Sequence, residues 1–167
     1  SGNAWSLVPV PANITLGPVR VKGQADESRH ADYGPNQGFV DTSSDAGTKT
    51  LTPLIETPQS ISIITRAQME AQAYPTAAQL LQYVPGVATG TRGGYDGRFD
   101  YVMMRGFNES IQGDYRDGLR QNVGLGSYFS YFGTEPYGLD RIDVVRGPSS
   151  VAYGQNAPGG IIDRISK

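Results

Sequence analysis

Residues 135–167 read EPYGLDRIDVVRGPSSVAYGQNAPGGIIDRISK. Two runs of apolar and β-branched residues in this stretch, 141–146 and 160–166, are typical of β-strands, and turns rich in Gly and Pro separate them. A third short strand region is expected upstream in YRDGLR, residues 115–120. A strand so near a chain end usually needs neighbouring strands to cover it. The stretch therefore predicts a sheet, and it leaves open whether the chain is a whole protein or one part of a larger one.

The residues Asp117 and Gly118 are a strong signal for a β-hairpin. They lie between Tyr115-Arg116 and Leu119-Arg120, and a type I′ turn needs positive φ at both central positions, which Asp and Gly tolerate. Further upstream, Gln59–Thr65 (QSISIIT) alternates between polar residues and Ile. This alternation predicts another strand.

Two capping boxes predict two short helices. In each, a Thr stands three residues ahead of a Gln, so that the two side chains can bond to the free backbone N–H groups of a first helical turn. The helices begin after Thr65 and Thr76. The first is expected to run to about Ala73, and the second ends at residues 84–86, where Pro disfavours helix in the preceding residue and Gly supplies a cap.

Three long loops are expected, at residues 90–100, 108–113 and 121–133, with a strand at 101–105 between the first two. Aromatic residues gather in or beside these loops: Tyr95, Phe99, Tyr101, Tyr115, Tyr128, Phe129, Tyr131 and Phe132. The rings either pack beneath their own loops or form an adaptable binding surface. The fold class is α/β (α+β), a small mixed sheet of four to six short strands with short helices and long loops. Residues 1–47 are expected to be flexible and residues 48–167 to form the folded domain.

Composition narrows the possible functions. The net charge of the 167 residues is −2, which argues against nucleic-acid binding because that function needs a basic face. The chain has no cysteine and a single histidine, His30. Disulfides, thiolate metal sites and a Cys nucleophile are thus excluded, and a His-dependent triad or metal site is not expected. No pairing of a nucleophile with a base is visible, so the chain is not expected to be an enzyme.

One island of alternating apolar residues stands out in the N-terminal part. It comprises Ile14, Thr15, Leu16, Val19 and Val21, and the spacing is that of an extended strand. Two interpretations remain open. The island is either a short edge strand or a peptide that pairs with the sheet edge of another protein by strand addition. Pro is tolerated in such a strand when it lies at an edge.

Several motifs in register carry a resemblance to a known family. They are TKT with PL (48–54), ETPQSISIIT (56–65), LLQYVPGV (80–87), MRGF (104–107), YRDGLR (115–120) and the quoted stretch 135–167. In this order they resemble the plug domain of TonB-dependent outer-membrane siderophore receptors. The resemblance implies a plug fold that lies inside a 22-stranded β-barrel, and the barrel is expected to be absent from this chain.

The resemblance also implies a ligand and the residues that contact it. The ligand is a ferric siderophore, and the apices of three plug loops contact it. The corresponding residues here are Arg92 and Tyr95, then Ser110, Ile111 and Gln112, then Tyr128, Phe129 and Tyr131. Because the siderophore saturates the iron, no protein ligand to iron and no other cofactor are expected. The sequence does not name the siderophore, and a haem receptor is a further alternative, although His30 is badly placed for an axial ligand.

The remaining implications concern partners. The island at 14–21 is similar to the TonB box region, which pairs with the C-terminal domain of TonB. Arg105 and Arg146 match plug arginines that pair with barrel glutamates; without the barrel we expect them to turn to solvent or find Asp or Glu. The expected location is the Gram-negative outer membrane, with the N-terminus in the periplasm and the isolated plug soluble. The alternative is a free-standing periplasmic module that binds a siderophore or TonB.

Overall fold

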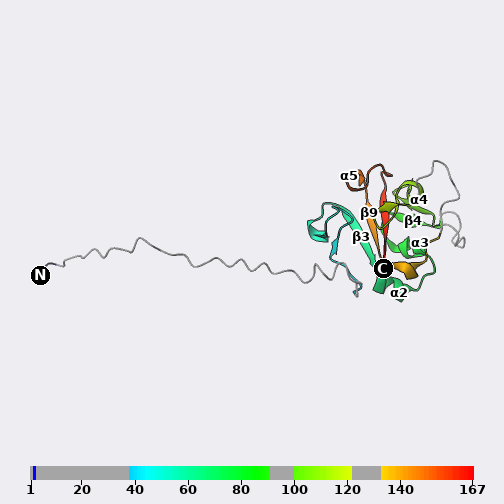
Figure 1. The fold of residues 1–167 in the computed structure, drawn as a ribbon, viewed down its shortest axis with the longest axis horizontal. Helices are drawn as coiled ribbons and strands as arrows, with labels where there is room; N and C mark the ends of the chain where they lie inside the picture. The colour runs from blue at the N-terminus through cyan, green and yellow to red at the C-terminus, as the bar shows by residue number, and fades with distance from the viewer. Residues whose placement is uncertain (1, 3–37, 91–99, 122–132) are drawn as a thin grey trace.

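The computed structural model describes residues 2, 38–90, 100–121 and 133–167 (Figure 1). The predicted TonB-box-like stretch at 14–21 lies outside the described residues, as does most of the segment 1–47 that we expect to be flexible.

A mixed sheet of five strands forms the centre of the described structure. The spatial order is β3-β9-β10-β7-β8. The bounds are β3 Ser60–Thr65, β9 Leu139–Arg146, β10 Gly160–Ser166, β7 Asp114–Arg116 and β8 Leu119–Arg120. β9 is antiparallel to both β3 and β10, and β7 runs parallel to β10. The strands predicted from the C-terminal stretch are thus confirmed as β9 and β10, two neighbouring strands in the interior of the sheet.

The β7–β8 hairpin has the turn that its sequence predicts. Asp117 and Gly118 have φ angles of 52° and 75°, as a type I′ turn requires. The turn is also tied to the end of β10, because the Asp117 carboxylate accepts a hydrogen bond from the Ser166 amide at 2.7 Å and the Gly118 amide donates to Asp163 at 3.1 Å. Local turn chemistry and tertiary contacts therefore agree here.

Both predicted capped helices are present. α2 covers Arg66–Gln72, with the Thr65 hydroxyl accepting a hydrogen bond from the Gln68 amide at 3.3 Å. α3 covers Ala77–Leu80, and the Thr76 hydroxyl accepts from the Gln79 amide at 3.4 Å. α3 continues as a 3₁₀ turn, η2, over Leu81–Tyr83. The second helix therefore tightens before it ends ahead of Pro85.

The predicted loop at 108–113 is wrong. Strand β6, Phe107–Asn108, is followed by one helical turn, α4, over Glu109–Gln112. The Asn108 side chain caps α4 by accepting a hydrogen bond from the Ser110 amide at 3.1 Å. A single turn is too short to show a helical period in the sequence, and its position is fixed by contacts with β5, β7 and β10.

Small elements without a sequence signal complete the fold. A second sheet has the order β4-β5-β6, with β4 at Val87–Thr89 and β5 at Val102–Met104. β1 (Ser43–Ser44) pairs with β2 (Thr52–Pro53). The single-turn helices are η1 Leu54–Glu56, η3 Pro136–Gly138 and α5 Ser150–Tyr153. β1 precedes Thr48, so the described structure begins earlier along the chain than the sequence indicated.

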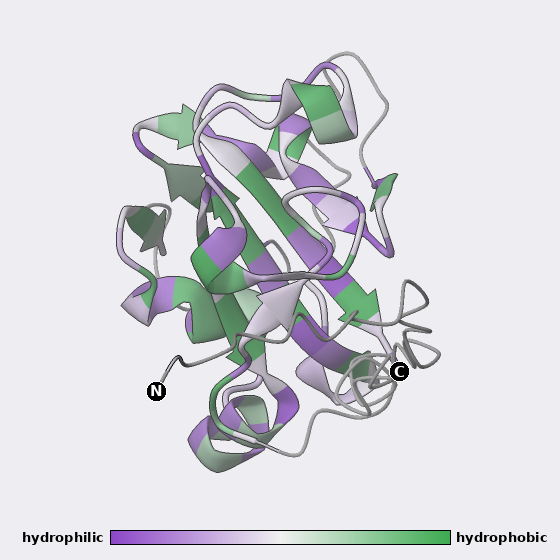
Figure 2. Ribbon diagram, turned by 90° about the vertical axis from the view of Figure 1, so that its left-hand side faces the viewer, coloured by the Kyte–Doolittle hydropathy of each residue, from purple (hydrophilic) through white to green (hydrophobic). Residues whose placement is uncertain are grey.

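The central sheet is covered on both faces. The larger apolar core lies on the face of Ile64, Ile142 and Val144, where α2, α3 and η2 pack. The opposite face carries Val145 and Ile161 with residues of the β1–β2 unit and α5. Figure 1 shows the β1–β2 unit and the α3–α4 region on opposite sides of β3 and β9, and Figure 2 shows hydrophobic and hydrophilic residues alternating along the long strands. Among the helices of the described segments, none is long and apolar enough to span a membrane.

Candidate functional site

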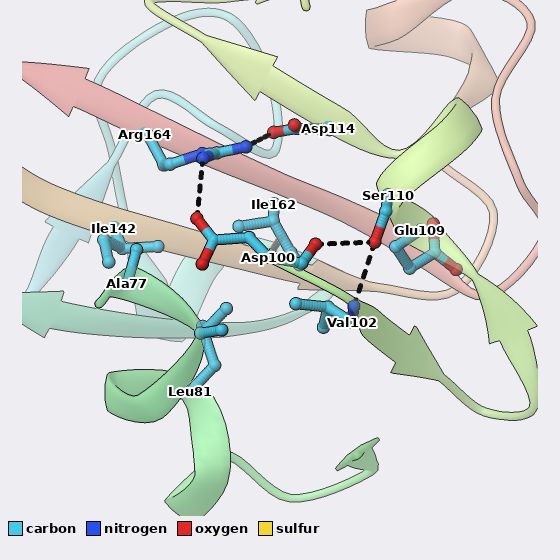
Figure 3. Close-up of a pocket in the computed structure, with 11 residues that line it drawn as sticks. Ala77, Leu81, Asp100, Val102, Glu109, Ser110, Asp114, Ile142, Ile162 and Arg164 are labelled. Carbon is cyan, nitrogen blue, oxygen red and sulfur yellow. Dashed lines mark hydrogen bonds and ion pairs between the residues drawn. The ribbon is translucent and has the colours of Figure 1, made fainter. Parts of the chain in front are cut away.

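A buried charged cluster lies on the sheet face that also carries the larger apolar core (Figure 3). We name Asp100, Asp114, Thr134 and Arg164 the Arg164 cluster. The guanidinium of Arg164, on β10, contacts the carboxylate of Asp100 at 3.4 Å and also contacts Asp114 and the hydroxyl of Thr134. The Arg164 side chain is only 9% exposed. Burial lowers the pKa of Arg164 from its very high ordinary value, with Asp100 acting in the opposite direction.

Asp100 joins this cluster to the neighbouring elements. Its carboxylate accepts the Thr134 amide at 2.7 Å, and its backbone carbonyl accepts the hydroxyl of Ser110 at 2.9 Å. The Ser110 hydroxyl in turn accepts the Val102 amide at 2.9 Å. Burial raises the pKa of Asp100, while the Thr134 hydrogen bonds and the charge of Arg164 oppose the rise. Ser110 thus braces β5 against α4 from a buried position.

The cavity beside the cluster is too small for a siderophore. Its volume is about 20 Å³, and it is lined by polar residues of the cluster together with apolar side chains of α3, β9 and β10. A cavity of this size has room for one water molecule. The cluster therefore supports the structure around it and does not itself enclose a ligand.

Glu109, the first residue of α4, is fully buried. Neither carboxyl oxygen has a hydrogen-bond partner in the described structure. The carboxyl group lies so close to Gly113 and Gly159 that a Cβ atom on either glycine would come within 2.2 Å of it. Burial raises the pKa of Glu109 to about 8. The side chain is therefore held as the neutral acid at neutral pH.

Arg105 and Arg146 meet at one turn. The Arg146 guanidinium donates to the Pro85 carbonyl at 3.1 Å, and the Arg105 amide donates to the Gly86 carbonyl at 3.0 Å. Arg105 is exposed, as predicted, whereas Arg146 is half-buried and bonds to a carbonyl instead of a carboxylate. The Nε atom of Arg146 is buried without a partner. Across the described parts of the chain, neither guanidinium has a carboxylate within ion-pair distance.

A second set of buried charges lies on the opposite face of the sheet. Arg141 contacts Asp45 at 3.0 Å and Asp143 at 3.3 Å, and Asp143 also accepts the Ser44 hydroxyl at 3.0 Å. Burial raises the pKa of Asp143 to about 6, against the opposing effects of Arg141 and Ser44. These contacts hold the β1 region, whose sequence has few apolar residues, on the sheet.

The structure brings only some of the predicted contact residues into view. Ser110 is buried, Ile111 is half-buried and Gln112 is exposed, all within α4. The other predicted ligand contacts lie outside the described residues, namely Arg92, Tyr95, Tyr128, Phe129 and Tyr131. The residues expected to pair with TonB also lie outside the described residues: Ile14, Thr15, Leu16, Val19 and Val21. The described segments hold no group of three or more His, Cys, Asp or Glu placed to bind a metal.

Sequence reasoning missed the Arg164 cluster and Glu109. The signal that was available for the cluster is the charged pair Asp163-Arg164 within the otherwise apolar strand β10. Charged residues are rarely buried unless they are paired, so two of them in a central strand indicate partners on both faces. No comparable signal marks Glu109, because its burial depends on the distant glycine Gly159.

Comparison with known proteins places this arrangement in a family. The family model for the TonB-dependent receptor plug domain matches residues 53–161. The chain belongs to this family. The matched segment of the plug begins within β2 and ends within β10, so it contains the whole of β3, β9 and the Arg105–Arg146 pair.

Curated relatives extend the match. The plug is 45% identical over 134 residues to the ferrioxamine receptor of Yersinia enterocolitica, covering 80% of the plug chain and 19% of the relative. It is 36% identical over 137 residues to the ferrichrome outer membrane transporter and phage receptor of Escherichia coli strain K12, covering 81% and 18%. The chain thus spans about a fifth of the length of these relatives. Both are receptors or transporters by name, in accord with the expectation of a non-enzyme.

A solved structure agrees. The siderophore receptor PiuA from Acinetobacter baumannii matches with a TM-score of 0.62 and 27% identity, over 80% of the plug chain and 18% of PiuA. The mixed fold with short helices that the sequence predicts is therefore confirmed as the plug fold.

Proposed function

We propose that this plug is the gate of an outer-membrane receptor that imports a ferric siderophore and uses TonB as its energy-coupling partner. The observation that carries the proposal is the 45% identity to a ferrioxamine receptor, which extends over 80% of the chain. A ferrioxamine B receptor of Salmonella typhimurium is 46% identical over 121 residues. A ferric siderophore of the ferrioxamine kind is therefore the ligand to test first.

The plug's partner in the membrane is a β-barrel, and Arg105 and Arg146 are its proposed contacts. The Arg105 guanidinium lies 3.2 Å from the Cβ position of Gly147, the residue that follows Arg146. Neither guanidinium has a carboxylate partner in the described structure, which favours neutralisation from outside the plug. Arginine suits this role because its planar guanidinium binds carboxylates through two hydrogen bonds. We assign both arginines to ion pairs with barrel carboxylates.

The ligand and TonB contacts are proposed from the family resemblance. The siderophore surface comprises Arg92, Tyr95, Ile111, Gln112, Tyr128, Phe129 and Tyr131, with the iron enclosed by the siderophore and no protein ligand to it. Ser110 is left out of this set, because its buried hydroxyl is already bound to Asp100 and Val102. Residues Ile14, Thr15, Leu16, Val19 and Val21 pair with the C-terminal domain of TonB by strand addition.

A chimeric receptor tests the proposal. Residues 1–167 of this chain replace the matching plug of the Yersinia enterocolitica ferrioxamine receptor, and cells expressing the chimera are assayed for iron uptake from ferrioxamine B. We expect uptake in cells with TonB and none in cells without it. Leu16→Asp should abolish uptake, since a buried charge is incompatible with the apolar side of an added strand, whereas Thr15→Ser should not. A chimera that reaches the outer membrane in normal amount but neither binds nor imports the siderophore would contradict the proposal.

The arginine pair gives a separate prediction. In the 167-residue chain, Arg105→Met should change the free energy of unfolding by less than about 0.5 kcal/mol, because the side chain is exposed. In the chimera, Arg105→Met combined with Arg146→Met should leave barrel carboxylates without a positive partner and so loosen the plug. Removing one partner of a buried ion pair costs about 3–5 kcal/mol. Urea unfolding measures the first effect, and protease sensitivity of the plug in outer-membrane preparations measures the second. Equal sensitivity of the double variant and the parent chimera would rule out the assigned contacts.

A further inference from the structure

The ends of two segments that are far apart in the sequence meet at the Arg164 cluster. Asp100 is the residue that follows 91–99, and Thr134 lies two residues after 122–132. The Thr134 amide donates to the Asp100 carboxylate at 2.7 Å, although the two residues are 34 positions apart. The guanidinium of Arg164 contacts both side chains from the central strand β10.

Every polar group of Thr134 forms a hydrogen bond within the protein. Its amide and hydroxyl bind Asp100 and Arg164, and its carbonyl accepts the Ala77 amide at the start of α3 at 3.0 Å. Asp100 is equally engaged, because its carbonyl accepts the hydroxyl of Ser110 in α4. The network therefore joins Asp100 and Thr134 to α4, for which ligand contacts are proposed.

Only arginine can make this junction. Its guanidinium presents five donors in a rigid planar fork, whereas lysine has a single ammonium group that acts as a point charge. Figure 3 shows the fork directed at Asp100 on one side and Asp114 on the other. Arg164 thereby connects β10, β7 and the chain at Asp100 through one side chain.

We infer that Arg164 is a positioning residue, which holds Asp100, Thr134 and the start of α4 in one arrangement and thereby positions Ile111 and Gln112 of α4 for contact with the ligand. The structural half, that Arg164 fixes these groups, follows from its contacts with Asp100 and Thr134 and from the hydrogen bond between Asp100 and Ser110. The half that concerns the ligand rests on the proposed function, which assigns siderophore contacts to Ile111 and Gln112 of α4.

Amide hydrogen exchange in the 167-residue chain tests the structural half. Arg164→Met should speed exchange of the Thr134 and Val102 amides about tenfold or more relative to amides within β9, because their acceptors Asp100 and Ser110 lose their fixed position. Arg141→Met is the matched control, since it also removes a buried arginine from an adjacent strand but on the opposite face. It should leave the Thr134 and Val102 exchange rates at their values in the unsubstituted chain.

Two further variants keep the test decisive if Arg164→Met fails to fold. Arg164→Lys retains the charge without the fork and should speed the same two amides less. Thr134→Val removes only the hydroxyl, and it should speed the Thr134 amide while leaving β9 unaffected. Unchanged exchange of both amides in all variants that fold, or an equal effect from Arg141→Met, would overturn the inference.

The ligand half is measured as the affinity of the chimeric receptor for ferrioxamine B. Arg164→Met should weaken binding about tenfold, whereas Arg141→Met should leave it within about twofold of the parent. Failure of the unsubstituted chimera to bind would overturn the proposed function and leave the exchange result standing. Faster exchange with unchanged affinity would overturn the positioning role of Arg164 while the proposed function survives.

Discussion

Replacement of Gly160 by alanine should leave the chain without a stable folded state. A Cβ at this position would lie 2.1 Å from the carbonyl oxygen of Val145 and 2.6 Å from the sulfur of Met104. The φ angle of Gly160 is +141°, a conformation that L side chains rarely adopt. Because the nearest obstacle is backbone of the central strand β9, no change of rotamer relieves the clash. We expect a loss of more than about 4 kcal/mol, which is large against the total stability of a small domain.

Alanine substitutions at two other glycines distinguish the steric clash from the cost of the unfavourable φ angle. Gly86 has a φ of +78° but open space around its Cβ position, so Gly86→Ala should cost about 1–2 kcal/mol from conformation alone. Gly138 has open space as well, and without a positive φ its replacement by alanine should be neutral within about 0.5 kcal/mol. Urea unfolding followed by circular dichroism gives all three values. A Gly160→Ala chain as stable as the Gly86→Ala chain would show that β9 and β10 can separate at low cost.

The Glu109→Gln chain should be more stable than the unsubstituted chain, and the advantage should grow as the pH rises. Glu109 is fully buried, its carboxyl oxygens have no partner among the described residues, and burial raises its pKa to about 8. Below the unfolded-state pKa of about 4.5, the carboxyl group is neutral in both states, so its titration does not change the stability. Between that value and about 8, the unfolded chain releases the proton while the folded chain keeps it, so folding becomes less favourable as the pH rises.

The size of this effect follows from the shift. A shift of one pKa unit corresponds to about 1.4 kcal/mol. Most of the rise in the pKa of Glu109 falls between pH 5 and pH 8, so the unfolding free energy of the unsubstituted chain should fall by about 3 kcal/mol over this range. Glutamine has nearly the same shape as the neutral acid and retains a donor, and the carbonyl of Met104 lies near the same position beside Gly159. The amide therefore replaces the protonated carboxyl group without titrating.

The measurement is the difference in unfolding free energy between the two chains at pH 5, 6, 7 and 8. Other buried carboxyl groups, such as Asp143, titrate in both chains and cancel in the difference. Glu70→Gln is the control, because Glu70 is an exposed partner of Arg66 in α2 and its replacement should change stability by less than about 1 kcal/mol. A Glu109→Gln advantage that stayed constant across the pH range would mean that Glu109 is ionised in the folded chain.

Local chemistry in the sequence predicted the elements whose geometry depends on adjacent residues. The Thr65 and Thr76 caps, the turn at Asp117-Gly118 and the strands on either side of 147–159 are all present. The elements that the sequence did not predict are short and depend on partners far away along the chain. α4 is one turn long, and β1 is two residues, held on the sheet by the hydrogen bond from Ser44 to Asp143 and by the ion pair between the next residue, Asp45, and Arg141.

The candidate sites divide in the same way. Motifs in sequence order were enough to indicate a plug, and the family match confirms it. The assignment of Arg105 and Arg146 to barrel contacts stays a prediction. Sequence placed Ser110 on a ligand loop, whereas the structure buries its hydroxyl between Asp100 and Val102. A residue type indicates what a side chain can bind, but the folded structure decides which partner lies next to it.

By itself, the sequence determined the long strands, the two capped helices, the Asp117-Gly118 turn, the family and the absence of cysteine chemistry, because these depend on residue type and near neighbours. Only the tertiary structure decided which charges are buried and with whom. Arg164 meets Asp100 and Thr134, and Glu109 meets Gly159, across separations of 30 to 64 residues for Arg164. The physical reason is that the free energy of a charge depends on its surroundings, and folding assembles those surroundings from distant parts of the chain.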